Sequence, residues 1–220
     1  VMPRLLFGGV YQLCRSVAGT SPFASSLPTM TVCGPNETTP SVSPSCLGSA
    51  TLVTIHGVGL DSSRDTVTES GFAPLGFLSP PVMAGDASTV VVTANFAHAG
   101  FTELEYAAAA GGHFHLDRFL VVGPNSAAAP AALIPPGDLI TVNITGAGLT
   151  SADTAYLVTG TDCTSSPAPG GTSPVTAASD GMSASASFTM ASGTYTVCYR
   201  SSCASVSFGL ATVHVGLVPG

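Results

Sequence analysis

The sequence contains no lysine and no tryptophan, and only 8% of its 220 residues are charged. Soluble domains usually have about 25% charged residues, so something other than ionic side chains has to keep this surface hydrated. All five basic residues are arginines, against twelve acidic residues. Because each phosphate contact needs its own cation, five scattered arginines exclude nucleic acid as a main partner.

Long hydrophobic runs are also lacking, although the mean hydropathy is +0.47. The apolar stretches are short and are interrupted by proline, glycine or a charge, as in 131–140. None reaches the ~18 to 20 residues that a membrane-spanning helix needs. Much of the hydropathy comes from alanine, while Ser, Thr, Gly and Pro fill most of the remainder. This composition favours strands and turns over long helices and predicts no membrane span within this segment.

Six cysteines and two N-x-[ST] sequons indicate the oxidising secretory route. The sequons begin at Asn36 and Asn143, and both are candidates for N-glycosylation. The chain starts with Val1-Met2-Pro3-Arg4, without an initiator methionine at position 1 and without a signal peptide. We therefore interpret it as an internal or processed segment of an extracellular or cell-surface protein.

Three sequence signatures recur at a spacing of about 90 residues. One is a glycine followed by alternating residues, one is a β-rich run that ends in Gly-x-Gly-Leu and then an aspartate, and one is a closing strand that exits into Gly-Pro. Their copies start at Gly9, Gly100 and Gly193; at Leu52 and Ile140; and at Met30, Phe119 and, more loosely, His214. They predict 1–35 as the C-terminal strands of a preceding domain, 36–123 as one whole domain and 124–220 as the next, joined by short Gly-Pro linkers.

Alternation within these signatures predicts strands. Thr102, Leu104 and Tyr106 are expected to face inward, while Glu103 and Glu105 face outward. The later copy predicts the same period of two, with Tyr195, Val197 and Tyr199 on one face and Thr194, Thr196 and Cys198 on the other. Turn residues separate such runs at the spacing typical of sandwiches. The predicted fold class is all-β, with tandem immunoglobulin-like β-sandwich domains of about seven strands each.

Residues 134–149 resemble the IPT/TIG type of immunoglobulin-like domain, with a proline-glycine lead-in, a β-rich strand and the turn Gly146-Ala147-Gly148-Leu149. In the earlier copy, 46–50 replaces the proline lead-in. The Gly-x-Tyr-x-Val-Cys-Tyr signature at 193–199 is similar to those of large repetitive surface proteins of protists, including glycosylated flagellar-hair and adhesion proteins. The resemblance implies an extracellular structural or adhesive role, and it brings no catalytic residues.

Two glycine pairs, in Gly57-Val58-Gly59 and Gly146-Ala147-Gly148, lack the third glycine of a dinucleotide-binding loop. We expect them to form β-turns with positive φ angles. His56, His98 and His214 are scattered, and no G-x-S-x-G or comparable turn lies near them. The sequence therefore predicts neither an enzyme nor a cofactor.

His113 and His115 form the most metal-like feature. Alternate residues of a strand share one face, and Glu103 and Glu105 lie on the neighbouring strand of the same hairpin. A slip of one residue in the register would move the histidines to the opposite face. The next copy has Val206 and Ser207 at these places, so a plain surface strand is the preferred interpretation and no metal site is assigned.

The cysteines are interpreted as structural. Cys14 and Cys198 occupy the same position in their copies. Cys198 could pair with Cys203 or with Cys163, Cys14 could pair with Cys33 or with a residue upstream, and Cys33 with Cys46 would join two copies. The sequence does not choose among the pairings.

Two proline-rich stretches are hydroxyl-rich and nearly uncharged, and we expect exposed loops or linkers that could carry O-glycans. The candidate positions are Thr38, Thr39, Pro40, Ser41, Ser43, Pro44 and Ser45 in the first, and Ser165, Ser166, Pro167 and Pro169 in the second. Covalent glycans would supply the hydration that the few charges do not.

Two functions remain. The preferred one is a structural building block of an extracellular glycosylated filament, appendage or surface coat, in which charge-poor faces bury against copies of the chain or against other surface proteins. The alternative is a cell-surface adhesion or carbohydrate-binding module that uses exposed loops. With no tryptophan to stack on a sugar, the composition favours the structural role.

Overall fold

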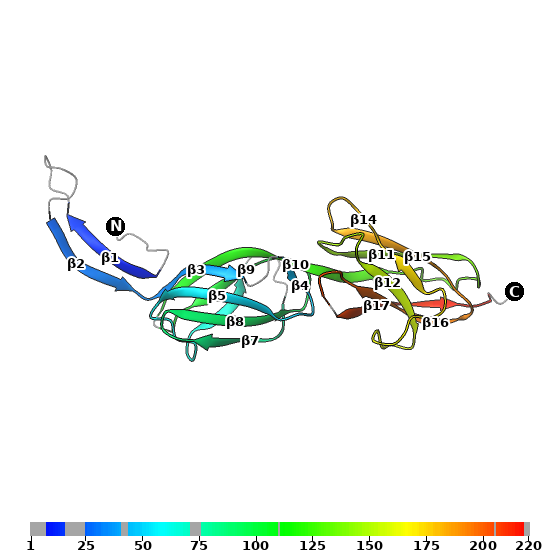
Figure 1. Cartoon of the computed structure of the whole chain (residues 1–220), viewed down its shortest axis with the longest axis horizontal. Helices are drawn as coiled ribbons and strands as arrows, with labels where there is room; N and C mark the ends of the chain where they lie inside the picture. The colour runs from blue at the N-terminus through cyan, green and yellow to red at the C-terminus, as the bar shows by residue number, and fades with distance from the viewer. Residues whose placement is uncertain are drawn as a thin grey trace.

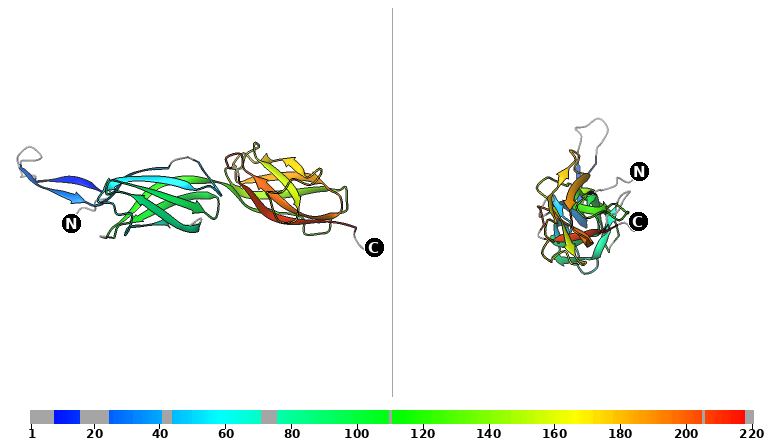
Figure 2. Two further views of the ribbon diagram at one scale, coloured as in Figure 1. Left: turned by 60° about the horizontal axis from the view of Figure 1, so that its bottom comes forward. Right: turned by 90° about the vertical axis from the view of Figure 1, so that its right-hand side faces the viewer.

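The computed structural model describes residues 8–15, 25–40, 44–70, 76–109, 111–204 and 206–217. Across these ranges the regular structure is β-strand throughout, so the described part of the chain contains no helix that could cross a bilayer. Two β-sandwiches follow one another along the long axis, and a two-stranded hairpin extends from the N-terminal side (Figure 1). Figure 2 shows the same rod-like outline from a second side and from its end.

The strands divide among these three parts. The hairpin consists of β1 (Gly9–Arg15) and β2 (Ser25–Val32). The first sandwich contains β3 (Gly34–Pro40), β4 (Ser45–Cys46), β5 (Thr51–Val58), β6 (Thr66–Ser70), β7 (Phe77–Gly85), β8 (Thr89–Phe96), β9 (Gly100–Ala107) and the first part of β10 (His113–Ala128). The second contains the rest of β10 with β11 (Leu139–Ala147), β12 (Thr154–Thr159), β13 (Thr172–Pro174), β14 (Thr176–Ala177), β15 (Ser183–Thr189), β16 (Gly193–Arg200) and β17 (Ser207–Val215).

The strand order is that of an immunoglobulin fold in both sandwiches. In the first, the sheet β3-β5-β8-β7 faces the sheet β6-β9-β10, with β4 beside β10. In the second, β10-β11-β15-β14 faces β13-β12-β16-β17. In each sandwich the opening strand, β3 or β10, thus lies in one sheet and the closing pair, β9-β10 or β16-β17, lies in the other, as in immunoglobulin domains. The predicted all-β, immunoglobulin-like fold class is confirmed.

The two hydrophobic cores form because apolar residues alternate along the strands. On β11, Ile140, Val142 and Ile144 are 0%, 0% and 1% exposed, and the residues between them are exposed. On β9, Leu104 and Tyr106 are fully buried as the alternation predicted. Each buried aliphatic side chain contributes about 1.5–3 kcal/mol, which makes these inner faces the main source of stability.

The Gly-x-Gly pairs serve two purposes, only one of which was predicted. Gly59 and Gly148 have φ of +65° and +61°, so each turn does require a left-handed residue. Gly146, by contrast, lies within β11, where a Cβ would come within 2.9 Å of Pro124 on the neighbouring strand. The first glycine of the pair therefore permits close packing of two strands and is not part of the turn.

A buried carboxylate joins two loops of the second sandwich. Asp153, 3% exposed, accepts hydrogen bonds from the hydroxyl of Tyr199 at 2.5 Å and from the backbone N–H groups of Thr150 at 2.7 Å and Ser202 at 2.6 Å. Burial by itself raises the pKa of Asp153, but these hydrogen bonds outweigh burial and hold the pKa below its usual value. The cluster connects the loop before β12 to the loop after β16.

The first sandwich has the same cluster at equivalent places. Asp65 accepts a hydrogen bond from the hydroxyl of Tyr106, and further ones from the N–H groups of Asp61 at 2.7 Å and Ala109 at 2.8 Å. Burial, and then the hydrogen bond to Asp65, raise the pKa of Tyr106 above its usual range. Each tyrosine therefore stays a neutral donor to its carboxylate at ordinary pH.

Acid is expected to destabilise the second sandwich through Asp153. Since the folded state depresses the pKa of this carboxyl, the stabilisation is present above the unfolded value of about 3.9 and is lost as the pH falls below it. We expect the Tm of the second sandwich to fall between about pH 5 and about pH 3, and the D153N variant to show a smaller fall. Thermal unfolding followed by circular dichroism measures both. An equal fall in the two proteins would assign the acid sensitivity to other carboxylates.

Candidate functional site: the junction between the sandwiches

One continuous strand passes through the junction. β10 pairs with β9 from His113 to Val121 and with β11 from Gly123 to Ala128, so the strand that closes the first sandwich also opens the second (Figure 1). The step Gly123-Pro124, expected as a linker, is therefore part of a strand. A register shift between Pro124 and Ser126 follows it, and such a bulge bends a strand and increases its twist.

The same arrangement recurs where the hairpin meets the first sandwich. β2 pairs with β1, and after Cys33 the chain continues as β3, which pairs with β5. A register shift between Pro35 and Glu37 stands at the place equivalent to the shift in β10. The N–H of Gly8 donates to the carbonyl of Pro35 at 2.7 Å. At both boundaries, from the hairpin to the first sandwich and from the first sandwich to the second, the strand that opens the next sandwich therefore contains a bulge near its start.

A disulfide crosses the junction beside β10. Cys46 of the first sandwich is bonded to Cys203, in the loop between β16 and β17 of the second, with the Cα atoms 5.9 Å apart and 157 residues of sequence separation. β4 is itself held against β10 by the parallel pairing of Ser45 and Cys46 with Val121 and Val122. The sandwiches are thus connected covalently at two places, the backbone of β10 and the disulfide.

Apolar side chains fill the space around these two connections. Leu47, 5% exposed, donates its N–H to the carbonyl of Val122 at 2.8 Å and packs over Gly123, where an added Cβ would lie 2.7 Å from that of Leu47. Ala147 and Phe208 of the second sandwich pack against the core of the first. The first core therefore extends across the boundary.

Asn125 adds polar contacts between the sandwiches. Its Oδ1 accepts the N–H of Ala99 at 2.6 Å, and its Nδ2 donates to the carbonyl of Ala99 at 2.9 Å. Asn125 lies at the bulge that opens the second sandwich, and Ala99 directly precedes β9 of the first. A crevice of about 380 Å³ opens beside them, with Phe96 and Phe208 among its lining residues. Both backbone groups of Ala99 are satisfied by one side chain from the other domain.

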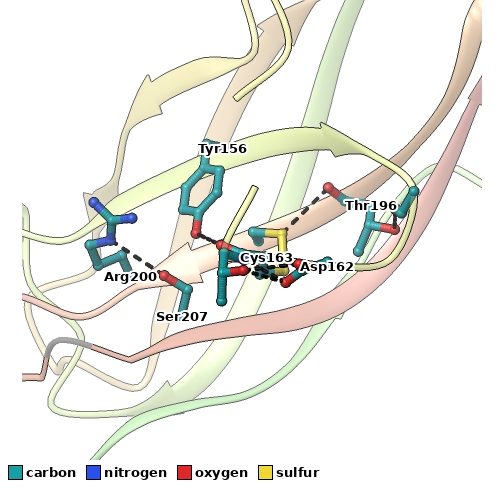
Figure 3. The surroundings of a disulfide bond; sticks show 9 residues. Tyr156, Asp162, Cys163, Thr196, Arg200 and Ser207 are labelled. Carbon is teal, nitrogen blue, oxygen red and sulfur yellow. Dashed lines mark hydrogen bonds between the residues drawn. A yellow bond between two sulfur atoms is a disulfide. The ribbon is translucent and has the colours of Figure 1, made fainter. Parts of the chain in front are cut away.

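The second disulfide lies within the second sandwich (Figure 3). Cys163, in the loop between β12 and β13, is bonded to Cys198 on β16, with 5.6 Å between the Cα atoms. The hydroxyl of Tyr156 donates to the carbonyl of Cys163 at 2.5 Å, and Tyr156 and Val158 form a small buried cluster with both cysteines. Cys198 is on the outer face, as the alternation predicted, yet it is fully buried because this loop covers it.

The structure selects among the cysteine pairings that the sequence left open. Cys163 with Cys198 was one of them. Cys46 is bonded to Cys203, which corrects the pairings of Cys46 with Cys33 and of Cys203 with Cys198. Cys33 is a free, exposed thiol, so the hairpin pairing with Cys14 is not formed either. Cys14 lies on β1 opposite Ser26, and its side chain is outside the described set.

The two histidines of β10 lie on the face that carries the glutamates. The Nδ1 of His113 contacts a carboxylate oxygen of Glu105, and the Nδ1 of His115 lies 3.2 Å from a carboxylate oxygen of Glu103. The histidine side chains are 71% and 67% exposed. Each histidine is thus matched to one glutamate across the strands, an arrangement that stabilises a sheet. Within the described ranges no three His, Cys, Asp or Glu side chains are grouped to hold a metal ion.

The candidate glycosylation residues are distributed over both sandwiches. Asn36 and Asn143 are exposed. Exposed candidates for O-glycosylation are Pro44, Ser165, Ser166, Pro167 and Pro169. Ser45 is only 2% exposed in β4, so the expectation of a glycan there is corrected. Thr38, Thr39 and Pro40 form the end of β3, with side chains outside the described set, and Ser41 and Ser43 lie outside the described residues.

Solved structures align with this chain at low similarity. The D0–D1 domains of intimin align over 82% of this chain and 98% of theirs, with 14% identity and a TM-score of 0.30. The Escherichia coli adhesin FdeC aligns over 95% and 74%, with 17% identity and a TM-score of 0.33. The Bacteroides ovatus protein SGBP-B of the mixed-linkage glucan utilization locus, in complex with a mixed-linkage heptasaccharide, aligns over 97% and 55%, with 16% identity and a TM-score of 0.30.

No protein-family model and no curated protein matches the chain. Two of the aligned proteins are named as an adhesin and as part of a glucan utilization locus, and none of the three is named as a filament protein. At TM-scores below 0.5 these alignments carry no argument about function. The fold assignment rests on the strand order of the two sandwiches.

Proposed function

We propose that this chain is a semi-rigid rod segment of an extracellular surface protein and serves as a structural element of a filament, appendage or surface coat. The junction carries this proposal. β10 and the bond between Cys46 and Cys203 connect the sandwiches at two separate points. A single flexible linker leaves two domains free to bend and rotate, whereas two separate connections oppose both motions.

Composition and bonding support an extracellular location. Disulfides persist in oxidising compartments, and the chain has one within a sandwich and one between sandwiches.

We assign no catalytic role. His56 and His214 each have the Nδ1 atom 3.1 Å from a strand hydroxyl, on Thr89 and Thr194 respectively, and these cross-strand contacts serve the sheets.

Adhesion or carbohydrate binding is the second candidate, and one exposed aromatic residue favours it. Phe101 on β9 is 57% exposed, and the guanidinium of Arg118 lies 4.6 Å from the centre of its ring. Aromatic residues and arginine are enriched at protein interfaces. A rod that presents this face to a partner would combine both functions.

Electron microscopy of the native full-length protein tests the proposal. We expect straight segments of sandwiches joined end to end, assembled into regular polymers with repeating contacts. Isolated, freely jointed domains like beads on a string would contradict the structural role. A glycan array is the complementary measurement, because clear and specific binding would favour the adhesion or carbohydrate-binding role instead.

A further inference from the structure

The outer face of the sheet β10-β11-β15-β14 is covered by small polar groups. On β11, the side chains of Thr141, Asn143 and Thr145 are exposed, and they alternate with Val142 and Ile144 in the core. The residues opposite them on β15 are Ser187, Ser185 and Ser183. The hydroxyls of Thr141 and Ser187 are 3.3 Å apart, and those of Thr145 and Ser126 are 2.7 Å apart. This face therefore presents hydrogen-bonding groups in a regular pattern.

Asn143 lies at the centre of this face with small residues on both sides. Its cross-strand partners are Ser185 on β15 and Ala128 on β10. Beside it is a hollow of about 450 Å³, lined on its polar side by Asn143, Thr145, Thr176, Ser183 and Ser185. Three alanines and the backbone around Ile144 complete the lining, and none of the lining residues is charged. The hollow offers hydroxyl groups and free space next to the amide of Asn143.

An uncharged, hydroxyl-rich group attached to Asn143 would match this hollow. Asn143-Ile144-Thr145 has the N-x-[ST] pattern that N-glycosylation requires. We infer that Asn143 carries an N-linked glycan and that the first sugars of this glycan lie in the hollow, hydrogen-bonded to Ser183 and Ser185. The outer sugars then hydrate a face on which the lining residues offer no charge. The inference does not depend on the proposed rod function.

The other sequon has a different setting. Asn36 lies at the register shift of β3 against β5, between Pro35 and Glu37. The residue at the equivalent shift in β10 is Asn125, whose amide bonds to Ala99 across the junction. An amide at this place can serve a contact between domains, so the inference is made for Asn143 alone.

Mass spectrometry of the chain secreted from a eukaryotic cell line tests occupancy. Release by peptide N-glycosidase in ¹⁸O water converts a glycosylated asparagine to labelled aspartate, which peptide mapping locates. We expect label at Asn143 in the unchanged chain and in the N36Q variant, and none at this position in N143Q. An unlabelled Asn143 in the secreted, folded chain would overturn the inference.

A shifted sequon tests whether the hollow seats the sugars. The double variant T141N/N143T moves the sequon two residues along the same strand and face, away from the hollow, and keeps a single glycan on β11. From folded protein, the enzyme should release the glycan of the unchanged chain about tenfold more slowly than the glycan of T141N/N143T. One or two hydrogen bonds between the sugars and the hollow supply a factor of this size. After denaturation the rates should be equal.

The variant S183A/S185A provides a second test on the original sequon. It removes the two hydroxyls that are inferred to bind the sugars while Asn143 and Thr145 stay in place. Release from the folded variant should be about as fast as from T141N/N143T. If release from the folded, unchanged chain is as fast as from both variants, the glycan is not seated in the hollow.

Discussion

Replacing Asp153 by alanine is expected to destabilise the second sandwich by about 3 kcal/mol. The substitution removes the shared acceptor of the Tyr199 hydroxyl and of the N–H groups of Thr150 and Ser202. A buried donor left without an acceptor costs about 1–3 kcal/mol, and the alanine also leaves space at a site that is 3% exposed. In addition, the loop before β12 and the loop after β16 would no longer be joined.

Chemical denaturation followed by circular dichroism measures this effect, and D138A is a suitable control. Asp138 is an exposed aspartate of the same sandwich, so its removal should change the free energy of unfolding by less than about 0.5 kcal/mol. Y199F removes one of the three donors and leaves the carboxylate in place, so we expect a loss of about 1 kcal/mol. If D153A and D138A unfold at the same denaturant concentration, the cluster does not stabilise the fold.

Strands and their buried faces could be predicted from the sequence because alternation is a local property. Side chains on a strand point to opposite faces in turn, so the order of Thr102, Leu104 and Tyr106 is enough to orient β9. The structure confirms that these three residues face inward. The aspartates and tyrosines of the two clusters also recur visibly in the sequence. The hydrogen bond between each aspartate and its tyrosine depends on how two loops meet in the folded domain, and no local sequence pattern specifies that.

The junction could not be predicted from local patterns for the same reason. Cys46 and Cys203 are 157 residues apart and belong to different sandwiches, so their pairing follows from the way the domains meet. The positions of His113 and His115 depend on the register of β10 against β9, which shifts between His115 and Arg118. Bulges of this kind change the register by one residue, and the sequence does not reveal where they occur.

Removing the junction disulfide in C46S/C203S is expected to let the sandwiches bend and rotate against each other. β10, the contact between Asn125 and Ala99 and the apolar packing of Ala147 and Phe208 would remain, but no second covalent connection would then oppose rotation of one sandwich about β10. We expect a wider distribution of maximum dimensions in small-angle X-ray scattering and of angles between domains in electron micrographs. The stability should also fall by about 5 kcal/mol, since a loop of this length is no longer closed in the unfolded chain.

The second disulfide supplies the matched control for this prediction. C163S/C198S removes a bond that closes 35 residues inside the second sandwich, and the loss of stability should be about 4 kcal/mol, slightly smaller because the loop is shorter. Because neither Cys163 nor Cys198 reaches the first sandwich, the distribution of angles between domains should stay as narrow as in the unchanged chain. Stability loss and loss of straightness are thereby separated. If both variants stay equally straight, β10 and its neighbouring contacts alone make the rod rigid. If both bend equally, weakening of the second sandwich is the cause, and the bond between Cys46 and Cys203 has no special part in holding the two domains in line.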